Sequence, residues 1–229
     1  MIDIYKLIML DADNTLFDFS KSESSALEKT MKAHSLDYDE SRDLIRYKKY
    51  NQIMWERFEK GEASIEEVHS ERWRMFLPQL DLDCKELDKE YLEFLSYESH
   101  LFDGAYETVK GLYEKGYKLT IVTNGSKSVQ ERRFASSEII KYFDHIVISS
   151  DIGIAKPHRG IFEHAARLSD VTDKNEILMV GDSIYADIKG GIDFGIDTCF
   201  LNPYDKEIPK EIVPKYVIKD IQELRGILL

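Results

Sequence analysis

The sequence places two aspartates, two positions apart, directly after a short apolar run. Asp11 and Asp13 follow the run "LIML" at residues 7–10. In an extended chain, residues i and i+2 point to the same side, so both carboxylates are expected to face one small space. Two like charges at that range repel each other unless a cation or a shared proton relieves the repulsion. We therefore expect another part of the chain to supply that relief.

Three later segments carry polar side chains directly after apolar runs. Thr123 and Asn124 end one run, Lys156 lies in the loop "IAKPHRGIF", and Asp182 follows another run in "GDSIYAD". In an open parallel sheet, ligands bind beyond the carboxyl ends of the strands. If the runs are parallel strands, these four segments bring their polar groups to one edge of the sheet.

The carboxylates in this set suit a hard cation. Asp11, Asp13 and Asp182 supply oxygen ligands, and Mg²⁺ prefers a few protein carboxylates while it keeps several waters. Lys156 adds a fixed positive charge. Because a metal ion would also relieve the repulsion between the first two carboxylates, we expect Mg²⁺ as the cofactor.

The remaining polar groups suit a phosphoryl group. Thr123 offers a hydroxyl, and Asn124 and Gly125 offer backbone N–H groups at the start of the next helix. Asp11 can act as a nucleophile and form an aspartyl-phosphate. Asp13 can protonate the leaving oxygen and then take a proton from the attacking water. The candidate catalytic residues are Asp11, Asp13, Thr123 and Lys156.

Each of these residues also has an ordinary structural alternative. The pattern Asp-x-Asp occurs in loop caps, in sugar-transferase metal sites and in EF-hands, although Leu16 stands where an EF-hand needs glycine. Thr123 could be a strand-end hydroxyl, Lys156 a solvated surface lysine, and Asp182 a turn or N-cap residue. Asp187 could be a first-turn helix acid or a residue that supports the metal ligands from behind. The combination of the four segments favours a shared site.

The elements that must position these residues follow from the hydrophobic pattern. Continuous apolar runs are typical of strands covered on both faces. Five such runs are at residues 5–10, 117–123, 145–149, 177–181 and 198–202. Amphipathic stretches lie between them: Ala105–Lys115, a stretch after Ser126, His158–Leu168 and Ala186–Phe194. Alternating strands and helices predict an α/β fold with a doubly wound parallel sheet.

The region from residue 20 to residue 99 has a different texture, with no strand-like run. It predicts helices at 20–35, 39–61, 64–77 and 85–97. Ser20 with Glu23, and Ser64 with Glu67, fit capping boxes at two of the starts. We therefore expect a catalytic core formed by 1–19 and 100–229, with a helical domain inserted at 20–99. The segment after Pro203 predicts a loop, a short edge strand and a last helix.

The composition limits the partners. The 229 residues carry a formal net charge of -12, which disfavours binding to nucleic-acid polymers and anionic membranes. The N-terminus lacks the features of a signal peptide, and no apolar run reaches membrane-spanning length, so a cytoplasmic location is expected. Cys84 and Cys199 are expected to be unpaired. No Walker A or G-x-G-x-x-G pattern is present.

Taken together, the four segments resemble the motifs of the haloacid dehalogenase (HAD) superfamily. They are "DADNT", "TNG", "AKP" with Lys156, and "GDSIYAD". The resemblance implies a Rossmann-like core with an inserted type-one cap at 20–99. It makes Asp11 the nucleophile and Asp13 the acid/base, and Thr123 and Lys156 would bind the phosphoryl group. Mg²⁺ would be held by Asp11, the carbonyl of Asp13 and Asp182.

Two positions refine this resemblance. The dehalogenase branch lacks the second aspartate, so Asp13 favours a phosphatase over a dehalogenase. Asn14 stands where many members have glycine, which removes no catalytic group.

A narrower resemblance is to the bacterial house-cleaning pyrimidine 5'-nucleotidases. It rests on stretches such as "DADNTLFDF", "WERFEKGEAS" and "TNGSKSVQERR". It implies a phosphoric monoester hydrolase that acts on small pyrimidine nucleoside 5'-monophosphates, as a monomer or small homo-oligomer. Phe17 and Trp55, with Phe58 and Trp73, are candidates to line the base pocket, although core packing is the more common role of large aromatics.

Two other functions remain open from the sequence. A phosphatase or phosphomutase for sugar phosphates or other small metabolites would use the same core residues with a differently lined insert. A non-catalytic, metal-binding regulator would bind a partner through the insert.

Overall fold

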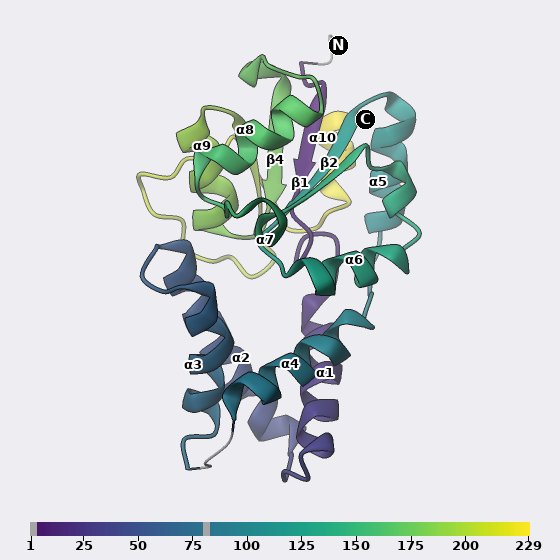
Figure 1. Cartoon of the computed structure of the whole chain (residues 1–229). Coiled ribbons are helices and arrows are strands. Elements are labelled where there is room, and N and C mark those ends of the chain that lie inside the picture. Colours follow the sequence, from purple (N-terminus) through teal and green to yellow (C-terminus); the bar gives the residue numbers. More distant parts are fainter. Residues whose placement is uncertain (1–3, 80–82) are drawn as a thin grey trace. The chain divides into compact units, whose positions relative to one another are not determined.

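The computed structural model describes residues 4–79 and 83–229 of the chain. The chain divides into two compact units. Met1–Phe19 and Ser99–Leu229 form the first, which we call the core unit, and Ser20–Glu98 forms the second, which we call the helical unit. Figure 1 shows the elements of both, and each unit is described by itself below.

The core unit contains a six-stranded sheet in the order β3-β2-β1-β4-β5-β6. The strands are β1 (Leu7–Leu10), β2 (Lys118–Thr123), β3 (His145–Ile148), β4 (Ile177–Gly181), β5 (Asp197–Leu201) and β6 (Tyr216–Ile218). All neighbouring pairs are parallel. The predicted α/β class with a doubly wound parallel sheet is confirmed. From β1 the chain continues to β2 on one side of the sheet and later returns to β4 on the other side of β1. The carboxyl ends of β1 and β4 therefore form a topological switch point.

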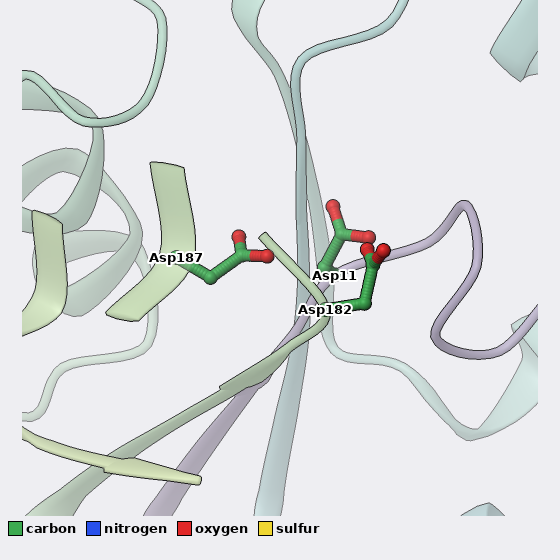
Figure 2. Close-up of side chains that lie close together, drawn as sticks. All are labelled: Asp11, Asp182 and Asp187. Carbon is green, nitrogen blue, oxygen red and sulfur yellow. The ribbon is translucent and has the colours of Figure 1, made fainter. Parts of the chain in front are cut away.

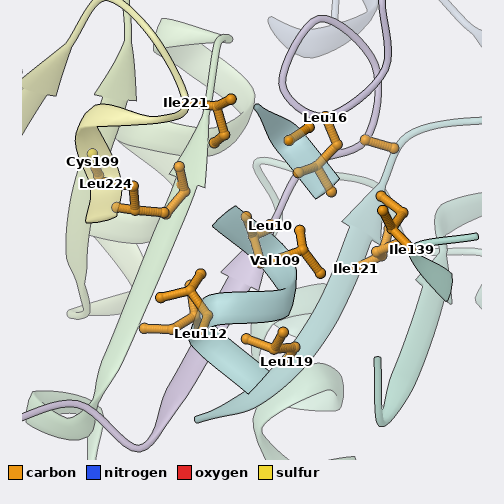
Figure 3. Close-up of a cluster of buried hydrophobic side chains, with 14 of the residues drawn as sticks. Leu10, Leu16, Val109, Leu112, Leu119, Ile121, Ile139, Cys199, Ile221 and Leu224 are labelled. Atoms are coloured by element: carbon orange, nitrogen blue, oxygen red, sulfur yellow. The ribbon is translucent and has the colours of Figure 1, made fainter. Parts of the chain in front are cut away.

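Alternate residues of each central strand enter two separate cores, and this explains the continuous apolar pattern. Ile8 and Leu10 of β1 pack with α5 (Ala105–Lys115) and α10 (Glu223–Leu228), in the cluster that Figure 3 shows. Leu7 and Met9 of β1 pack on the other face with α8 (Arg159–Leu168) and α9 (Gly190–Phe194). The two faces bury every residue of this strand, so no polar alternation is possible.

The remaining elements of the core unit are short. They are α6 (Lys127–Ala135), α7 (Ser149–Ile152), the 3₁₀ turns η1 (Ile140–Tyr142) and η2 (Lys174–Glu176), and η3 (Ile184–Lys189). The helix predicted at Ala186–Phe194 begins two residues earlier and has two parts, because a π-type segment, η3, precedes α9. The helix predicted from His158 begins at Arg159, since the His158 side chain is the N-cap and accepts from Gly160 N at 3.1 Å.

The chain leaves and re-enters the core unit at neighbouring positions. Asp18 N donates to His100 O at 2.8 Å, and Phe17 forms an antiparallel bridge with Leu101. The two ends of the inserted segment are thus paired by backbone contacts that belong to the core unit.

The helical unit is built from α1 (Phe19–Ala33), α2 (Glu40–Glu59), α3 (Ile65–Phe76) and α4 (Cys84–Ser96). The capping box at Ser64 and Glu67 is present, with both reciprocal bonds formed. The capping box predicted at Ser20 and Glu23 is wrong, because α1 begins at Phe19 and the Glu23 side chain is buried against Asn51. None of the helices in the described part of the chain is long and apolar enough to cross a membrane.

A polar network crosses the interior of the helical unit. Buried Arg72 forms an ion pair with Asp88 and donates to Asn51 Oδ1 at 2.9 Å. Trp73 Nε1 also donates to Asp88 Oδ1, at 2.9 Å. Asn51 Nδ2 in turn donates to Glu23 Oε1 at 2.8 Å. The network thus gives buried Glu23 an amide as a hydrogen-bond partner, and burial raises the pKa of its carboxyl group above the ordinary value.

Candidate active site

Three aspartates gather at the switch point of the sheet. Asp11 follows β1 and Asp182 follows β4, and Asp11 N continues the strand pairing by donating to Val180 O at 2.9 Å. Asp187 comes from η3, and ligand oxygens of the three carboxyl groups lie within 4.8 Å of one another (Figure 2). Oxygen-only donors at this spacing fit a hard divalent cation such as Mg²⁺.

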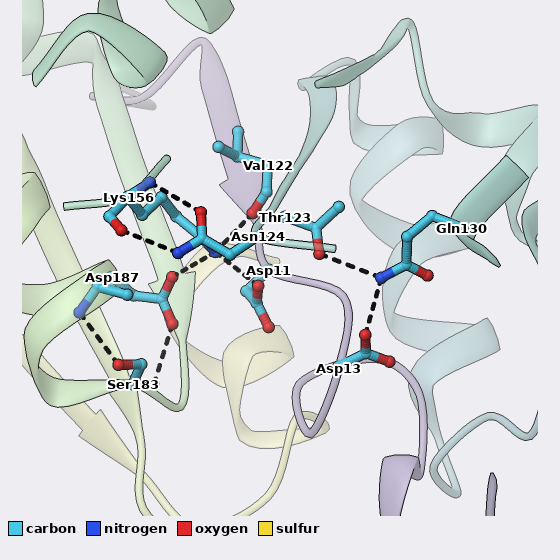
Figure 4. Close-up of polar contacts among 10 residues, drawn as sticks. Asp11, Asp13, Val122, Thr123, Asn124, Gln130, Lys156, Ser183 and Asp187 are labelled. Atoms are coloured by element: carbon cyan, nitrogen blue, oxygen red, sulfur yellow. Dashed lines mark hydrogen bonds and ion pairs between the residues drawn. The ribbon is translucent and has the colours of Figure 1, made fainter. Parts of the chain in front are cut away.

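Lys156 places a buried ammonium beside two of these carboxylates. Its Nζ lies 2.6 Å from Asp11 Oδ1 and 2.7 Å from Asp187 Oδ1, and it also donates to Val122 O at 2.6 Å (Figure 4). The lysine side chain is 2% exposed. The solvated surface position that the sequence left open for Lys156 is therefore ruled out.

Burial and charge act against each other at this pair. Burial raises the pKa of Asp11 to about 7, because the attraction of Lys156 only partly offsets it and the charges of Asp187 and Asp13 add to it. Burial disfavours the ammonium of Lys156, but Asp11 and Asp187 outweigh that cost and raise the pKa of Lys156 above its ordinary value. Lys156 stays cationic, and a single ammonium faces more than one carboxylate. The excess negative charge is what a divalent cation can balance.

Asn124 holds the backbone of the lysine loop. Its Nδ2 donates to Lys156 O, and its Oδ1 accepts from Lys156 N, both at 2.8 Å. The sequence indicated only the backbone N–H of Asn124 as a substrate-binding group. The structure adds a separate task, because this amide fixes the residue that carries the ammonium.

Asp187 is held behind the site by the loop after β4. Its Oδ2 accepts from Ser183 N at 3.0 Å, and its Oδ1 contacts Lys156. A Cβ at Gly181 would lie 2.2 Å from Asp187 Oδ2, so this position must be glycine for the carboxylate to fit. The side chain of Asp187 is 1% exposed, which fits the supporting role that the sequence left open.

Asp13 has partners different from those of Asp11. The chain turns directly after β1, with Leu16 N donating to Ala12 O at 2.9 Å and Asn14 at a φ of 62°, a conformation that asparagine tolerates. The carboxylate of Asp13 then contacts α6, where Gln130 Nε2 donates to Oδ2 at 2.8 Å. The extended-chain argument thus overstated how far the two aspartates share one space.

Two residues of α6 were missed by the sequence analysis. Arg133 Nη1 lies 2.6 Å from Asp13 Oδ1, and Gln130 contacts both Asp13 and Thr123. The available signal was their spacing of three, which puts both side chains on one face of the helix that follows "TNG".

The aromatic candidates lie in different surroundings. Phe17 is fully buried in the core unit, with its ring 5.5 Å from that of Phe134. Trp55 of α2 is partly buried, and its ring lies 5.7 Å from that of Phe58. Trp73 is buried in the helical unit, where its indole N–H is bound by an aspartate. The positions of Phe17 and Trp73 are those of core residues, and substrate contact by Phe17 or Trp55 stays a prediction.

Comparison with known proteins places this site in a family. A family model for haloacid dehalogenase-like hydrolases matches residues 5–195. The chain is 33% identical to the HAD-hydrolase YfnB of Bacillus subtilis, over 98% of this chain and 95% of that protein. The YfnB crystal structure bound to magnesium superposes with a TM-score of 0.93 over 98% of each chain.

Two further relatives carry a named activity. The pyrimidine 5'-nucleotidase YjjG of Escherichia coli is 28% identical, over 96% of each protein. The pyrimidine 5'-nucleotidase PynA of Streptococcus pneumoniae is 30% identical, over 96% of this chain and 93% of that protein. With a matching family model over most of its length and relatives that span nearly all of it, this chain belongs to the haloacid dehalogenase-like hydrolases.

Proposed function

We propose that this hydrolase is a magnesium-dependent phosphomonoesterase that forms an aspartyl-phosphate on Asp11, with pyrimidine nucleoside 5'-monophosphates as its substrates. The observation that carries the proposal is the pairing of buried Asp11 with the Lys156 ammonium at 2.6 Å, beside Asp182 and Asp187. A nucleophilic carboxylate, a fixed cation and further oxygen ligands at one edge of the sheet are the groups that phosphoryl transfer requires.

The donor set fits a magnesium ion. Asp11, Asp182 and the backbone carbonyl of Asp13 would hold it, with Asp187 behind them. When bound, the ion supplies positive charge to the non-bridging phosphoryl oxygens and favours the ionised form of Asp11. The name of the YfnB crystal structure, which is bound to magnesium, supports this cofactor for the present chain.

The first half of the reaction uses Asp11 and Asp13. A carboxylate oxygen of Asp11 bonds to phosphorus while the bond from phosphorus to the ester oxygen breaks. Asp13 donates a proton to that oxygen, so the alcohol leaves neutral. The Thr123 hydroxyl and the Lys156 ammonium bind the phosphoryl oxygens, and the charge of Lys156 is already in place before substrate arrives.

The second half regenerates Asp11. Asp13, now ionised, takes a proton from a water molecule whose oxygen bonds to phosphorus. The bond between phosphorus and the Asp11 oxygen breaks, and inorganic phosphate leaves. Asp13 ends the cycle protonated, as it began.

The substrate class rests on different support from the chemistry. The names of YjjG and PynA support a pyrimidine nucleotide, and the helical unit would act as the cap that selects it. None of the side-chain contacts described at the site distinguishes a nucleoside from a sugar as the leaving group. A phosphatase for sugar phosphates or other small metabolites is therefore the alternative outcome of the substrate test.

Phosphate release from a panel of phosphomonoesters, with Mg²⁺ and with a chelator, tests the proposal. The panel contains uridine, thymidine, cytidine and purine monophosphates and several sugar phosphates. Metal-dependent preference for pyrimidine monophosphates is expected. Metal-dependent preference for sugar phosphates would replace the substrate and keep the mechanism.

The nucleophile is tested by Asp11→Asn, which is expected to abolish turnover in a folded protein. Asp193→Asn is the matched control, because this aspartate is exposed on α9, where it forms an ion pair with Lys189. Activity of Asp11→Asn above roughly a tenth of wild type would overturn the nucleophile assignment.

A further inference from the structure

The acid/base aspartate is enclosed by donors from one helix. Gln130 Nε2 donates to Asp13 Oδ2 at 2.8 Å, and Arg133 Nη1 forms an ion pair with Asp13 Oδ1 at 2.6 Å. Both oxygens of the carboxylate are thus held from α6 (Figure 4 shows the glutamine contact). The Asp13 side chain itself remains 25% exposed, so it is accessible while its direction is fixed.

The orientation of the Gln130 amide follows from Arg133. Arg133 Nη1 donates to Gln130 Oε1 at 3.0 Å, which fixes the amide oxygen on the arginine side. The Nε2 group is therefore turned toward Asp13 and also reaches Thr123 Oγ1, at 3.3 Å. The glutamine links the candidate acid/base to the hydroxyl that would bind the phosphoryl group.

Arg133 is itself tightly enclosed within the core unit. Its side chain is 0% exposed, and its guanidinium lies 5.4 Å from the centroid of the Phe17 ring and 5.9 Å from that of Phe19. A buried guanidinium close to two aromatic rings has little freedom to move, and a carboxylate partner favours its burial. Asp13 is that carboxylate.

The chain also leaves room for this arrangement. A Cβ at Gly125 would lie 2.5 Å from Gln130 Nε2 and 2.6 Å from its Cγ. The glycine of "TNG" therefore does more than expose a backbone N–H, because a side chain there would displace the glutamine.

We propose that Gln130 and Arg133 are positioning residues that fix the Asp13 carboxylate for proton transfer, with Gln130 acting on the reaction through Asp13 rather than through Thr123. The shorter contact supports this order, at 2.8 Å to Asp13 against 3.3 Å to Thr123. The inference rests on the proposed phosphomonoesterase mechanism, in which Asp13 serves both half-reactions.

Gln130→Met tests the proposal, because it keeps the length of the side chain and removes both polar atoms. Two substrates are compared: a nucleoside 5'-monophosphate, whose alkoxide must be protonated as it leaves, and p-nitrophenyl phosphate, whose phenolate leaves without a proton. Formation of the phosphoenzyme from the aryl ester does not need Asp13 as an acid. Its hydrolysis needs Asp13 as a base for both substrates.

The expected pattern separates positioning from general damage. With the aryl ester, Gln130→Met should lower kcat about 10- to 100-fold and leave kcat/KM unchanged, with a burst of nitrophenol as phosphoenzyme accumulates. With the nucleotide, both kcat and kcat/KM should fall. An equal fall of kcat/KM for both substrates would mean that Gln130 acts through Thr123 or through the fold, and would overturn the proposal.

Control variants sharpen the result. Glu131→Met introduces the same side chain at an exposed position of α6 and should change neither substrate's kinetics. In an Asp13→Asn background, Gln130→Met should have no further effect on kcat, because the residue it positions is already inactive. Arg133→Lys should retain part of the activity that Arg133→Met loses, since the positive charge remains although the planar array of guanidinium N–H donors is lost.

A stability cycle gives a readout that does not depend on turnover. The effects of Gln130→Met and Asp13→Ala on the melting temperature should be non-additive if the two side chains bind each other, since alanine removes the acceptor. Additive effects would overturn the positioning contact. If the wild-type protein hydrolyses neither ester with Mg²⁺, the proposed function fails, and the stability cycle still decides whether Gln130 holds Asp13.

Discussion

Nζ of Lys156 lies 2.6 Å from Oδ1 of Asp11, and both side chains are buried. The two residues come from loops after different strands, and they are 145 positions apart in the chain. The same ammonium lies 2.7 Å from Asp187 Oδ1. One lysine therefore reduces the electrostatic repulsion between two buried carboxylates. The site depends on this ammonium both for stability and for charge balance.

Replacing this ammonium should damage both properties. In Lys156→Met, Asp11 and Asp187 lose their shared cation, and breaking a buried ion pair costs about 3–5 kcal/mol. Activity should fall about 10²- to 10³-fold if, as proposed, this charge stabilises the phosphoryl group during transfer. Lys189→Met, at an exposed ion pair, should change little. Unfolding free energies and kcat/KM measure the two effects, and a stable, active Lys156→Met would contradict the charge argument.

The contact between Asp187 and the Lys156 ammonium should also contribute measurably to activity. Asp187→Asn keeps the shape of the side chain but removes the charge that faces Lys156, and an activity loss of about 10- to 100-fold is expected. Gly181→Ala should have a similar effect, since its Cβ would lie 2.2 Å from Asp187 Oδ2. The two variants act on one group, so the double variant should be little worse than either alone. Additive losses would show that Gly181 acts elsewhere.

Magnesium should stabilise the protein in the absence of substrate. Asp11, Asp182 and Asp187 offer oxygens within 4.8 Å of one another, and a bound cation relieves their repulsion. At a concentration of about 100 times Kd, binding to the folded state alone adds about 2.7 kcal/mol. The melting temperature is measured with Mg²⁺ and with a chelator. Asp182→Asn should reduce the shift, and an unchanged shift would place the metal somewhere else.

Stability should depend on pH through a buried glutamate of the helical unit. Burial raises the pKa of Glu23 from 4.5 to about 7, and the hydrogen bond from Asn51 only partly opposes it. Between these values the folded state holds a proton that the unfolded state has lost. Stability therefore falls as pH rises through this window, by about 3 kcal/mol in all.

Glu23→Gln should remove the glutamate's share of this dependence, because the amide keeps an acceptor for Asn51 and carries no charge. Asp11, whose pKa burial also raises to about 7, contributes equally to both proteins, so the comparison with wild type isolates Glu23. The melting temperature of Glu23→Gln should match wild type near pH 5 and exceed it at pH 8. Glu28→Gln, at an exposed ion pair on the same helix, is the control. Asp88 does not interfere, since Arg72 and His69 outweigh burial and hold the pKa of Asp88 low, so its contribution is lost only in more acidic solution. Parallel pH curves for Glu23→Gln and wild type would contradict the assignment.

The sequence predicted the sheet well because strands that are buried on both faces appear in the sequence as continuous apolar runs. The run at 177–181 matches β4 residue for residue, and the polar residues after β1, β2 and β4 fall where the switch point requires them. The expectation at Ser20 failed because a capping pattern is local. Phe19 already has a helical position, and tertiary contact with Asn51 gives Glu23 another partner.

The direction of side chains was harder to predict than their position. Asp13 follows a strand, but the turn at Asn14 directs it to α6 rather than to the side of Asp11. The spacing of Gln130 and Arg133 indicates only a shared helix face, and their partner Asp13 is identified once the helix is placed against that turn. The candidate catalytic residues could thus be named from spacing, whereas the residues that contact Asp13 from α6 required coordinates.

The paired ends of the inserted segment have a consequence for modularity. Asp18 and His100 are joined by a 2.8 Å backbone hydrogen bond, and Phe17 bridges Leu101, so the core unit closes its own chain at the point of insertion. An inserted segment can therefore begin and end there without separating the strands that precede Asp11 and Lys156. The helical unit is accordingly an insertion into a core unit whose backbone is already closed. Under the proposed function, this allows substrate choice to diverge through the helical unit while the residues of the core unit stay unchanged.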